Sequence, residues 1–457
     1  MVEDTRCRRL NERDQRRGRY VLYWMQQSQR ASFNPALERA IAVANRAGLP
    51  VLVAFGLMDD YPEANLRHYR FMLEGLRDVA TTLARRGIGF VVRRGAPGDV
   101  AVALAQDAAL MVCDRGYLRH QKAWWQDVAA RAPCGVIQVE GDVVVPLEAA
   151  SDKVEAAART LRPKLHRLWE EYLTPLEDAP VRQSSHDLPI ASIDVADIEG
   201  VLGGLKLDRS VPPVRRLRGG TSEARRRLWE FVGASLDGYA AGRSEPAAFQ
   251  CSLLSPYLHF GQISPVEIAL AVRDARQGAD ADRRAYLEEL IVRRELAANF
   301  VQFEPRYHDY AGLPGWARAT LEAHRADPRP HVYTREQLET ACTHDRYWNA
   351  AMHEMVHTGF MHNYMRMYWG KKILEWTPDP ETAFQTTLYF NNRYFLDGRD
   401  ANSYANVAWI FGAHDRPWPE RPVFGKVRAM TATGLERKFD MAAYLRAVDA
   451  LVDAERG

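Results

Sequence analysis

Short apolar runs alternate with amphipathic stretches in the first third of the chain. Two long stretches, Leu66–Arg86 and Pro97–Gln106, have helical periodicity. Around them lie five runs that are typical of buried strands: Tyr20–Tyr23, Pro50–Phe55, Gly89–Val92, Leu110–Cys113 and Gly135–Val139. This alternation predicts βαβ units and a doubly wound parallel sheet. In such a sheet, ligands bind at the carboxyl ends of the strands, where the strand order reverses.

No standard phosphate-binding loop follows the first predicted strand. Residues 24–30 read WMQQSQR, which contains neither GxGxxG nor GxxxxGK[ST]. A standard dinucleotide or P-loop site is therefore disfavoured. The sequence predicts a Rossmann-like α/β domain that lacks the GxGxxG loop.

The pattern changes after residue 150. A helical stretch at Lys153–Tyr172 leads into residues 175–215, where Pro, Ser, Asp and Gly collect as in an interdomain linker. From Ser222 onward nearly every segment has a helical period. We therefore predict an α/β domain at 1–150, a helical segment with a linker at 151–221, and an all-α domain at 222–457.

Composition indicates a globular protein. The chain has 457 residues, of which 47% are hydrophobic and 26% charged. It contains no apolar run of about 18 residues, and its first residues lack an apolar signal core. We expect a cytoplasmic location, associated with the nucleoid if the source is bacterial. The five Cys form no CxxC pair, which disfavours a disulfide framework and a Cys-type zinc site.

Arginines gather in two clusters although the net charge is only +2. One cluster lies between Arg6 and Arg19, and the other between Arg215 and Arg227. Such clusters can neutralise phosphates, or they can form an arm or helix face that is only solvated. The sequence alone leaves both interpretations open.

Residues 353–357 read HEMVH and match the HExxH pattern of zinc hydrolases. Two His at this spacing share a helix face and can bind Zn²⁺, with the Glu as base. A third ligand is required, and neither His344 nor His362 has a recognised spacing. A helix with two His on a partly polar face is the favoured explanation of the pattern, and we predict no metal site.

The following segment resembles a flavin-binding helix. Residues 358–367 read TGFMHNYMRM, similar to the TGxMHNxxRM stretch of the photolyase and cryptochrome family. Three further blocks agree in order and spacing: residues 252–264 (SLLSPYLHFGQIS) with the FAD-phosphate segment, 288–295 (EELIVRRE) with the substrate-binding helix, and 396–400 (LDGRD) with the flavin-ring loop. The resemblance covers essentially the whole chain.

Residues 23–30, 157–164 and 366–376 are similar to class II cyclobutane pyrimidine dimer photolyases. Members of that class use reduced FAD (FADH⁻) and blue light to split the flipped-out dimer by electron transfer. The resemblance implies UV-damaged DNA as the partner, a monomer, and no metal or membrane. Family members place a deazaflavin, a folate or nothing in the N-terminal domain, and the sequence leaves this antenna chromophore open.

The resemblance also implies a set of flavin contacts. Arg366 and Asp397 resemble the ion pair beside the isoalloxazine ring, and Asn391 is the expected partner of flavin N5, with Asn402 and Asn406 as alternatives. Cys251 replaces a Thr that is usual in the family. The implied cofactor-binding residues are Tyr239, Arg243, Ser252, Leu253, Leu254, Ser255, Asn363, Arg366, Asn391, Asp397 and Arg399.

Further matches concern the substrate. Glu289 matches the acid that hydrogen-bonds the base edge of the dimer, and Met367 and Trp409 match walls of the dimer pocket. Together with Asn391 these are the implied catalytic residues. Trp418 and Arg428 resemble class II residues that fill the hole left in the duplex.

Three tryptophans are candidates for an electron relay. Val407 occupies the position of the nearest relay Trp in commoner classes, so that route is absent. Trp369 and Trp376 lie seven residues apart on one predicted helix, and Trp348 lies on the helix before it. Core packing is the simplest explanation of such spacing. The resemblance favours a relay through Trp369 and Trp348, with Trp376 as a further branch.

A cryptochrome-type blue-light receptor is the nearest alternative function. Such receptors commonly append a long C-terminal tail, whereas a helix-like segment closes this sequence soon after Arg428. The repair enzyme is therefore favoured. A HExxH zinc hydrolase is an alternative of a different class.

Overall fold

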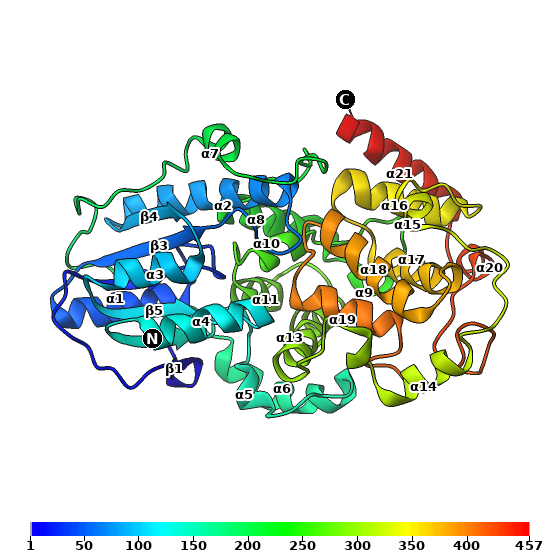
Figure 1. Cartoon of the computed structure of the whole chain (residues 1–457), viewed down its shortest axis with the longest axis horizontal. Helices are drawn as coiled ribbons and strands as arrows, with labels where there is room; N and C mark the ends of the chain where they lie inside the picture. The colour runs from blue at the N-terminus through cyan, green and yellow to red at the C-terminus, as the bar shows by residue number, and fades with distance from the viewer. Residues whose placement is uncertain (1, 457) are drawn as a thin grey trace.

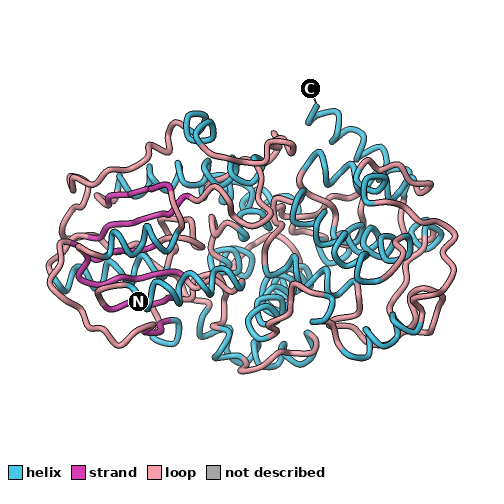
Figure 2. Tube along the Cα trace, viewed as in Figure 1, coloured by secondary structure: helices cyan, strands magenta, loops and turns pink. Residues whose placement is uncertain are grey.

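The computed structural model describes residues 2–456 and has a sheet half and a helical half (Figure 1). All strands of the described chain lie between residues 7 and 139, at the left of Figure 2. No described helix combines the length and apolar content that crossing a membrane requires.

The sheet has six strands in the order β1-β6-β5-β2-β3-β4. The strands are β1 (Cys7–Arg9), β2 (Tyr20–Trp24), β3 (Val51–Leu57), β4 (Gly89–Arg94), β5 (Ala108–Asp114) and β6 (Gly135–Val139). All pairs are parallel except β1 with β6. The predicted doubly wound parallel sheet is therefore confirmed, and only the short edge strand β1 was not predicted.

Helices cover both faces of the sheet, because alternate side chains of each strand point to opposite faces. On one face, Val21, Val53 and Val112 pack with residues of α1 (Pro35–Ala47) and α2 (Leu66–Arg85). On the other, Leu22 and Ala54 pack with α3 (Pro97–Ala105) and α4 (Arg119–Arg131). The sheet is thus buried on both sides.

The strand order reverses at β2, between β5 and β3. At this point the backbone N–H groups of Gln26, Gln27 and Ser28 donate to Asp114 Oδ2 at 2.9, 3.0 and 3.0 Å. Three converging N–H groups are what an anion needs, and here a carboxylate of the protein accepts them. This contact explains why the loop after β2 needs no glycine-rich phosphate motif.

Residues 173–220 connect the halves and are held along the sheet. After α5 (Leu147–Ala150) and α6 (Ala158–Tyr172), the chain returns to the edge strand β4. There the Ile193 N–H donates to the Val92 carbonyl at 2.8 Å, and α7 (Ile198–Gly204) packs on α2. The predicted linker therefore covers the exposed edge of the sheet.

The remaining residues form helices that pack around two apolar clusters, one containing Leu228, Tyr257 and Leu290 and the other containing Trp348, Trp369 and Tyr444. In order they are α8 (Thr221–Glu230), η2 (Phe231–Ser235), α9 (Tyr239–Gly242), α10 (Ser255–His259), α11 (Pro265–Arg273), α12 (Asp280–Leu287), η3 (Glu288–Arg293), α13 (Arg294–Phe303), η4 (Tyr310–Gly312), α14 (Gly315–Ala323), α15 (Arg335–Glu339), α16 (Arg346–Thr358), α17 (Asn363–Trp376), α18 (Pro380–Tyr394), α19 (Ala401–Ile410), α20 (Ala432–Glu436) and α21 (Met441–Arg456).

Replacing Asp114 by Ala should lower the free energy of unfolding by about 3 kcal/mol, because it leaves buried donors of the loop after β2 without an acceptor. Urea denaturation measures this change. Asp107→Ala is the matched control, since the ion pair of Asp107 with Arg19 is exposed and worth less than about 1 kcal/mol. Equal effects of the two substitutions would contradict the role given to Asp114.

Candidate functional site

A cavity of about 1450 Å³, which includes space open to solvent, lies in the helical half. Thirteen of the residues predicted to serve a flavin or its substrate line it: Tyr239, Arg243, Ser252, Leu253, Leu254, Ser255, Glu289, Asn363, Arg366, Met367, Trp369, Asn391 and Asp397. Residues from distant parts of the sequence therefore converge on one site.

Helix α17 brings four of these residues to the cavity wall. Helix α16 ends at Thr358, and the chain turns at the next residue, Gly359, whose φ of 68° is the left-handed conformation that favours glycine. His362 then caps α17, because its Nδ1 accepts the N–H of Tyr364 at 3.2 Å. This turn between the two helices explains why glycine is needed in the TGFMHN segment.

Arg366 and Asp397 form a two-pronged ion pair on the wall. Arg366 Nη1 and Nη2 each donate to a different oxygen of Asp397 at 3.1 Å, and Arg366 Nε donates to the carbonyl of Met361 at 2.9 Å. The guanidinium carbon lies 3.9 Å from the centroid of the Phe395 ring. Because its donors are held in this way, Arg366 presents a fixed positive charge beside the cavity.

Glu289 and Arg243 also form an ion pair, with Nη1 and Oε1 3.0 Å apart. Glu289 lies in η3, a stretch of wider helical turns between α12 and α13, and such turns often occur at functional sites. Both side chains are about one third exposed, 31% and 32%, so a ligand can reach the pair. A base edge that approaches Glu289 must share its carboxylate with Arg243.

Asn391 lies on α18, and its Nδ2 donates to Asn392 Oδ1 at 3.1 Å. Asn392 in turn donates to Glu63 at 2.7 Å, which ties this part of the wall to the sheet half. Asn402 and Asn406 line the same cavity. The choice of Asn391 among the three as the N5 contact stays a prediction.

Arg399 does not line this cavity, contrary to the expectation for a flavin contact. Its Nη1 donates to the carbonyl of Asn392 at 2.8 Å and lies 2.8 Å from His68 Nε2. The residue has a left-handed backbone with φ of 61°, and its side chain lies on a different cavity from that of Asp397. Its buried guanidinium joins the two halves of the molecule.

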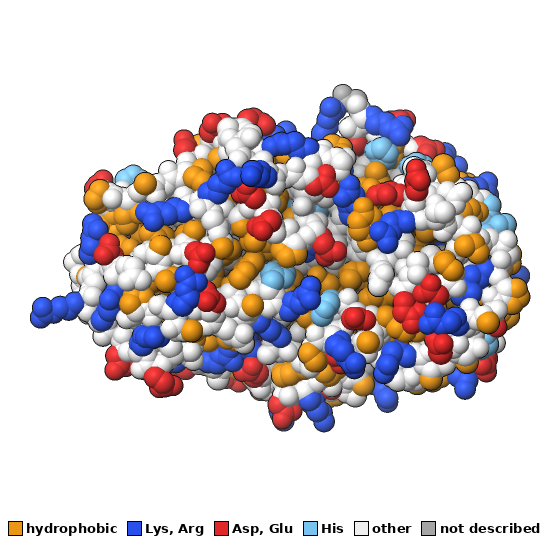
Figure 3. All heavy atoms as spheres, viewed as in Figure 1, with side chains coloured by type: hydrophobic (Ala, Val, Ile, Leu, Met, Phe, Trp, Pro, Cys, Tyr) orange, Lys and Arg blue, Asp and Glu red, His pale blue; other side chains and the backbone are white. Residues whose placement is uncertain are grey.

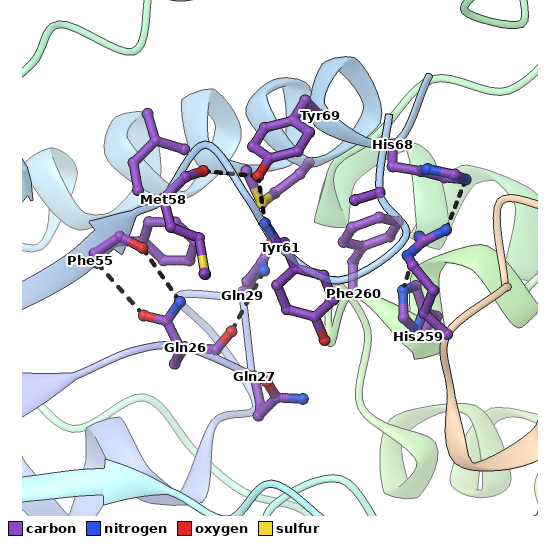
Figure 4. Close-up of a pocket in the computed structure, with 15 residues that line it drawn as sticks. Gln26, Gln27, Gln29, Phe55, Met58, Tyr61, His68, Tyr69, His259 and Phe260 are labelled. Carbon is purple, nitrogen blue, oxygen red and sulfur yellow. Dashed lines mark hydrogen bonds between the residues drawn. The ribbon is translucent and has the colours of Figure 1, made fainter. Parts of the chain in front are cut away.

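That second cavity, of about 570 Å³, lies at the carboxyl ends of β2 and β3 (Figure 4). Tyr69 Oη donates to the Met58 carbonyl at 2.7 Å, and Gln26 Nε2 donates to the Gly56 carbonyl at 3.3 Å. Figure 4 shows the Tyr61 ring among these residues, with Phe260 coming from the helical half. The cavity thus occupies the usual ligand position of a doubly wound sheet.

The three predicted relay tryptophans lie one after another in space, from Trp369 at the large cavity to Trp348 and then Trp376 in the core. Trp369 lines the cavity, and Trp348 Nε1 donates to the Trp369 carbonyl at 3.0 Å. The rings of Trp348 and Trp376 are 5.7 Å apart and edge to face. All three are almost fully buried. Their packing is sufficient to explain them, and their redox use stays a prediction.

Trp409 lies beside a hollow of about 650 Å³, whose lining shares Glu289 and Asn363 with the large cavity. The guanidinium of Arg293 lies 5.9 Å from the Trp409 ring centroid. Trp418 and Arg428 line another hollow, of about 930 Å³, and the Arg428 guanidinium lies 5.1 Å from the Trp418 ring centroid. The predicted DNA contacts, Trp409, Trp418 and Arg428, therefore lie in hollows of the protein surface.

Many arginines of the two clusters bind groups of the protein itself. Arg6 Nη2 donates to the Val144 carbonyl at 2.7 Å, and Arg227 Nε donates to Tyr257 at 3.0 Å. Arg225 pairs with Glu267 at 2.5 Å. On the face drawn in Figure 3, basic and acidic side chains are interspersed. The structure therefore favours a structural role for much of these clusters over phosphate binding.

The HExxH residues do not form a metal site with a third ligand. Glu354 is fully buried, and Tyr444 of α21 donates to its Oε2 at 2.8 Å, whereas His353 is exposed. Among residues 2–456, no group of three or more His, Cys, Asp or Glu side chains could hold a metal ion. Burial raises the pKa of Glu354 to about 7.

Two further wall residues had no role in the sequence prediction. Tyr286 Oη donates to Ser252 Oγ at 3.0 Å, and Arg294 lies five residues after Glu289 in the EELIVRRE block. Arg294 Nε and Trp369 Nε1 are buried and have no hydrogen-bond partner among the described residues. A buried N–H without a partner is unfavourable, so a polar ligand in the cavity fits this lining. The sequence showed the helical period around these residues, but it could not show that they line a cavity.

A sheet domain joined to a helical domain with such a cavity is the fold of photolyases and cryptochromes. The structure is similar to that of a bacterial class III photolyase from Agrobacterium tumefaciens, with a TM-score of 0.74, 20% identity, and coverage of 94% of this chain and 86% of the other. It is also similar to a cryptochrome from Synechocystis, with a TM-score of 0.71, 15% identity, and coverage of 93% and 88%.

Sequence comparison identifies the family. A family model for DNA photolyase matches residues 21–182. The deoxyribodipyrimidine photo-lyase of Methanothermobacter thermautotrophicus is 47% identical over 99% of this chain and 100% of its own length. That of Potorous tridactylus is 40% identical over 93% of this chain and 81% of its own. The chain therefore belongs to the deoxyribodipyrimidine photo-lyase family.

Glu354→Gln should raise the free energy of unfolding at pH 8 by on the order of 1–3 kcal/mol. The folded-state pKa of Glu354, about 7, exceeds the usual 4.5. The contribution of the protonated Glu354 to stability is therefore fully present below pH 4.5 and is lost as the pH rises through 7. Gln keeps an acceptor for Tyr444 without a buried charge. Urea denaturation at pH 5 and pH 8 measures the difference.

The exposed His353→Gln is the control and should give no gain at pH 8. A Glu354→Gln protein that loses more stability at pH 8 than at pH 5 would contradict the conclusion that burial raises the pKa of Glu354.

Proposed function

We propose that this protein repairs cyclobutane pyrimidine dimers in DNA in blue light, as a photolyase of class II. The observation that carries the proposal is one cavity lined by most of the residues predicted for the flavin and by Glu289 and Met367, which are predicted for the dimer. The relatives named deoxyribodipyrimidine photo-lyase support the activity. Support for class II comes from the residues that resemble that class, including the buried Trp369 and the absence of a tryptophan at Val407.

FAD is the proposed cofactor of the large cavity, and in its reduced form it supplies the light-driven electron. Arg366 would stabilise a negative charge on the bound ring, because Asp397 holds the Arg366 guanidinium in position. Ser252 and Ser255 offer hydroxyls to the diphosphate. Cys251 is a weak substitute for a hydroxyl, since burial raises its pKa to about 11 and keeps the thiol protonated.

The dimer would leave the duplex and enter the cavity mouth, where Glu289 meets its base edge and Met367 and Trp409 pack against its rings. The Trp418 and Arg428 pair would stand in the gap left in the duplex. Trp369, Trp348 and Trp376 would carry electrons to the cofactor when it is oxidised. The bound lesion is thus contacted from several sides.

We also infer that the second cavity is where an antenna chromophore, a deazaflavin or a folate, would bind. Its aromatic lining with Phe55 and Tyr61 suits a flat ring system. We propose the domain limits 1–150, 151–221 and 222–457, and a monomer in the cytoplasm, associated with the nucleoid if the source is bacterial. Within the segment 151–221, Leu161 and Leu165 of α6 share an apolar core with Leu228, so α6 packs on the helical half.

The purified protein should show flavin absorption and should remove dimers from an oligonucleotide only when it is reduced and illuminated. Chromatography of the digested DNA measures the loss, with a dark sample as control. Light-induced spectral changes without repair would favour the cryptochrome-type receptor instead. A colourless protein would refute the proposal, and a fluorescence excitation band foreign to flavin would report an antenna.

Trp409→Ala should weaken binding of dimer-containing DNA by about 1–3 kcal/mol, because it removes one stacking surface. Fluorescence anisotropy with damaged and undamaged oligonucleotides measures this loss. Trp229→Ala is the matched control, since Trp229 is 60% exposed on α8 and does not line the cavity or the hollow beside it. An equal loss in both variants would exclude a specific role for Trp409.

A further inference from the structure

A buried tyrosine and a carboxylate lie beside the chain of tryptophans. Tyr368 is fully buried on α17, and its Oη donates to Asp345 Oδ2. The other oxygen of Asp345 accepts the N–H groups of Tyr347 at 2.9 Å and Trp348 at 3.1 Å, and so caps α16. The phenol is therefore held against a carboxylate whose position is fixed by a helix.

This pair is close to the tryptophans through two helices. Tyr368 precedes Trp369 in α17, and Asp345 caps the helix that carries Trp348. Tyr368, Lys372 and Trp376 follow one another at four-residue steps on one helix face. Lys372 Nζ lies 5.6 Å from the Tyr368 ring centroid and 5.6 Å from the Trp376 ring centroid. Both rings thus flank a single ammonium group.

The charges favour an uncharged oxidised product at this end of the chain. Glu375 Oε2 lies 2.6 Å from Lys372 Nζ and balances the charge of this ammonium. A positive charge on a buried aromatic ring is unfavourable in the core, and an oxidised tyrosine avoids it by losing its proton to the carboxylate of Asp345. Burial and the adjacent carboxylate raise the pKa of Tyr368, which keeps the phenol protonated before oxidation.

We propose that Tyr368 is the terminal electron donor to the tryptophan chain and that Asp345 accepts its proton. A tryptophan radical cation takes one electron from Tyr368 and returns to neutral tryptophan. The O–H bond of Tyr368 breaks, its proton moves to Asp345 Oδ2, and a neutral tyrosyl radical remains beside a protonated carboxyl. This inference rests on the proposed function, because light must first withdraw an electron through Trp369.

Tyr333 provides a matched comparison within the same region. Its ring lies 5.5 Å from that of Trp376, and its Oη lies 2.7 Å from His344 Nδ1. It is less buried than Tyr368, and its partner is an imidazole. Substitution of each tyrosine by Phe therefore distinguishes the carboxylate pair from a second tyrosine near the same tryptophan.

The experiment illuminates the full-length, flavin-loaded oxidised protein without an external reductant. Transient absorption and electron paramagnetic resonance distinguish neutral tyrosyl from tryptophan radicals. We expect a tyrosyl signal that forms more slowly in D₂O, is lost in Tyr368→Phe and persists in Tyr333→Phe. Asp345→Asn keeps a helix cap and an acceptor but takes no proton, so it should lose the signal and prolong the tryptophan radical.

A tyrosyl signal that survives Tyr368→Phe, or that disappears in Tyr333→Phe instead, would overturn the inference. So would a parent protein that forms only tryptophan radicals, or none. A separate repair assay with chemically reduced protein distinguishes failure of this inference from failure of the proposed function. If that protein still repairs dimers in light, only the role of Tyr368 falls, and if it does not, the proposed function falls as well.

Discussion

One buried arginine fastens the sheet half to the helices around the cavity. Arg67, in the first turn of α2, donates to the carbonyls of Pro212, Tyr394 and Val356 at 2.9, 2.7 and 2.5 Å. Two of these carbonyls end α16 and α18, where the helix dipole favours a cation. Burial lowers the pKa of Arg67 to about 10, which leaves it charged near neutral pH. The loop that carries Asp397 begins directly after Tyr394, so its position depends on this contact.

The sequence predicted local features well, and it predicted poorly the features that depend on contacts between residues far apart in the chain. The sheet was predictable because strand and helix periods are local, and the cavity residues were predictable because four sequence blocks resemble one family. The edge strand β1 was missed, because its Cys7–Arg9 sequence carries two arginines and no apolar alternation. Its pairing with β6 depends on residues far away in the sequence.

Side-chain direction and partners were the parts that sequence could not supply. Asp397 and Arg399 belong to one five-residue block, yet they face different cavities, because Arg399 adopts a left-handed backbone. The arginine clusters resembled a phosphate-binding surface, but carbonyls and carboxylates distant in sequence accept many of their donors. The HExxH pattern likewise depended on Tyr444 of the last helix, which holds Glu354 in the core.

The loop at 396–400 acts as a thin wall between the two cavities. Asp397 lies on the large cavity and Arg399 on the smaller one, with only Gly398 between them. A Cβ at Gly398 would lie 2.7 Å from the Asn391 carbonyl oxygen, so glycine permits the close approach of this loop to α18. The sheet contributes to the same arrangement, because Asp114 fills the anion position after β2 and leaves the strand ends free to line the smaller cavity. The two cavities are therefore separated by one loop.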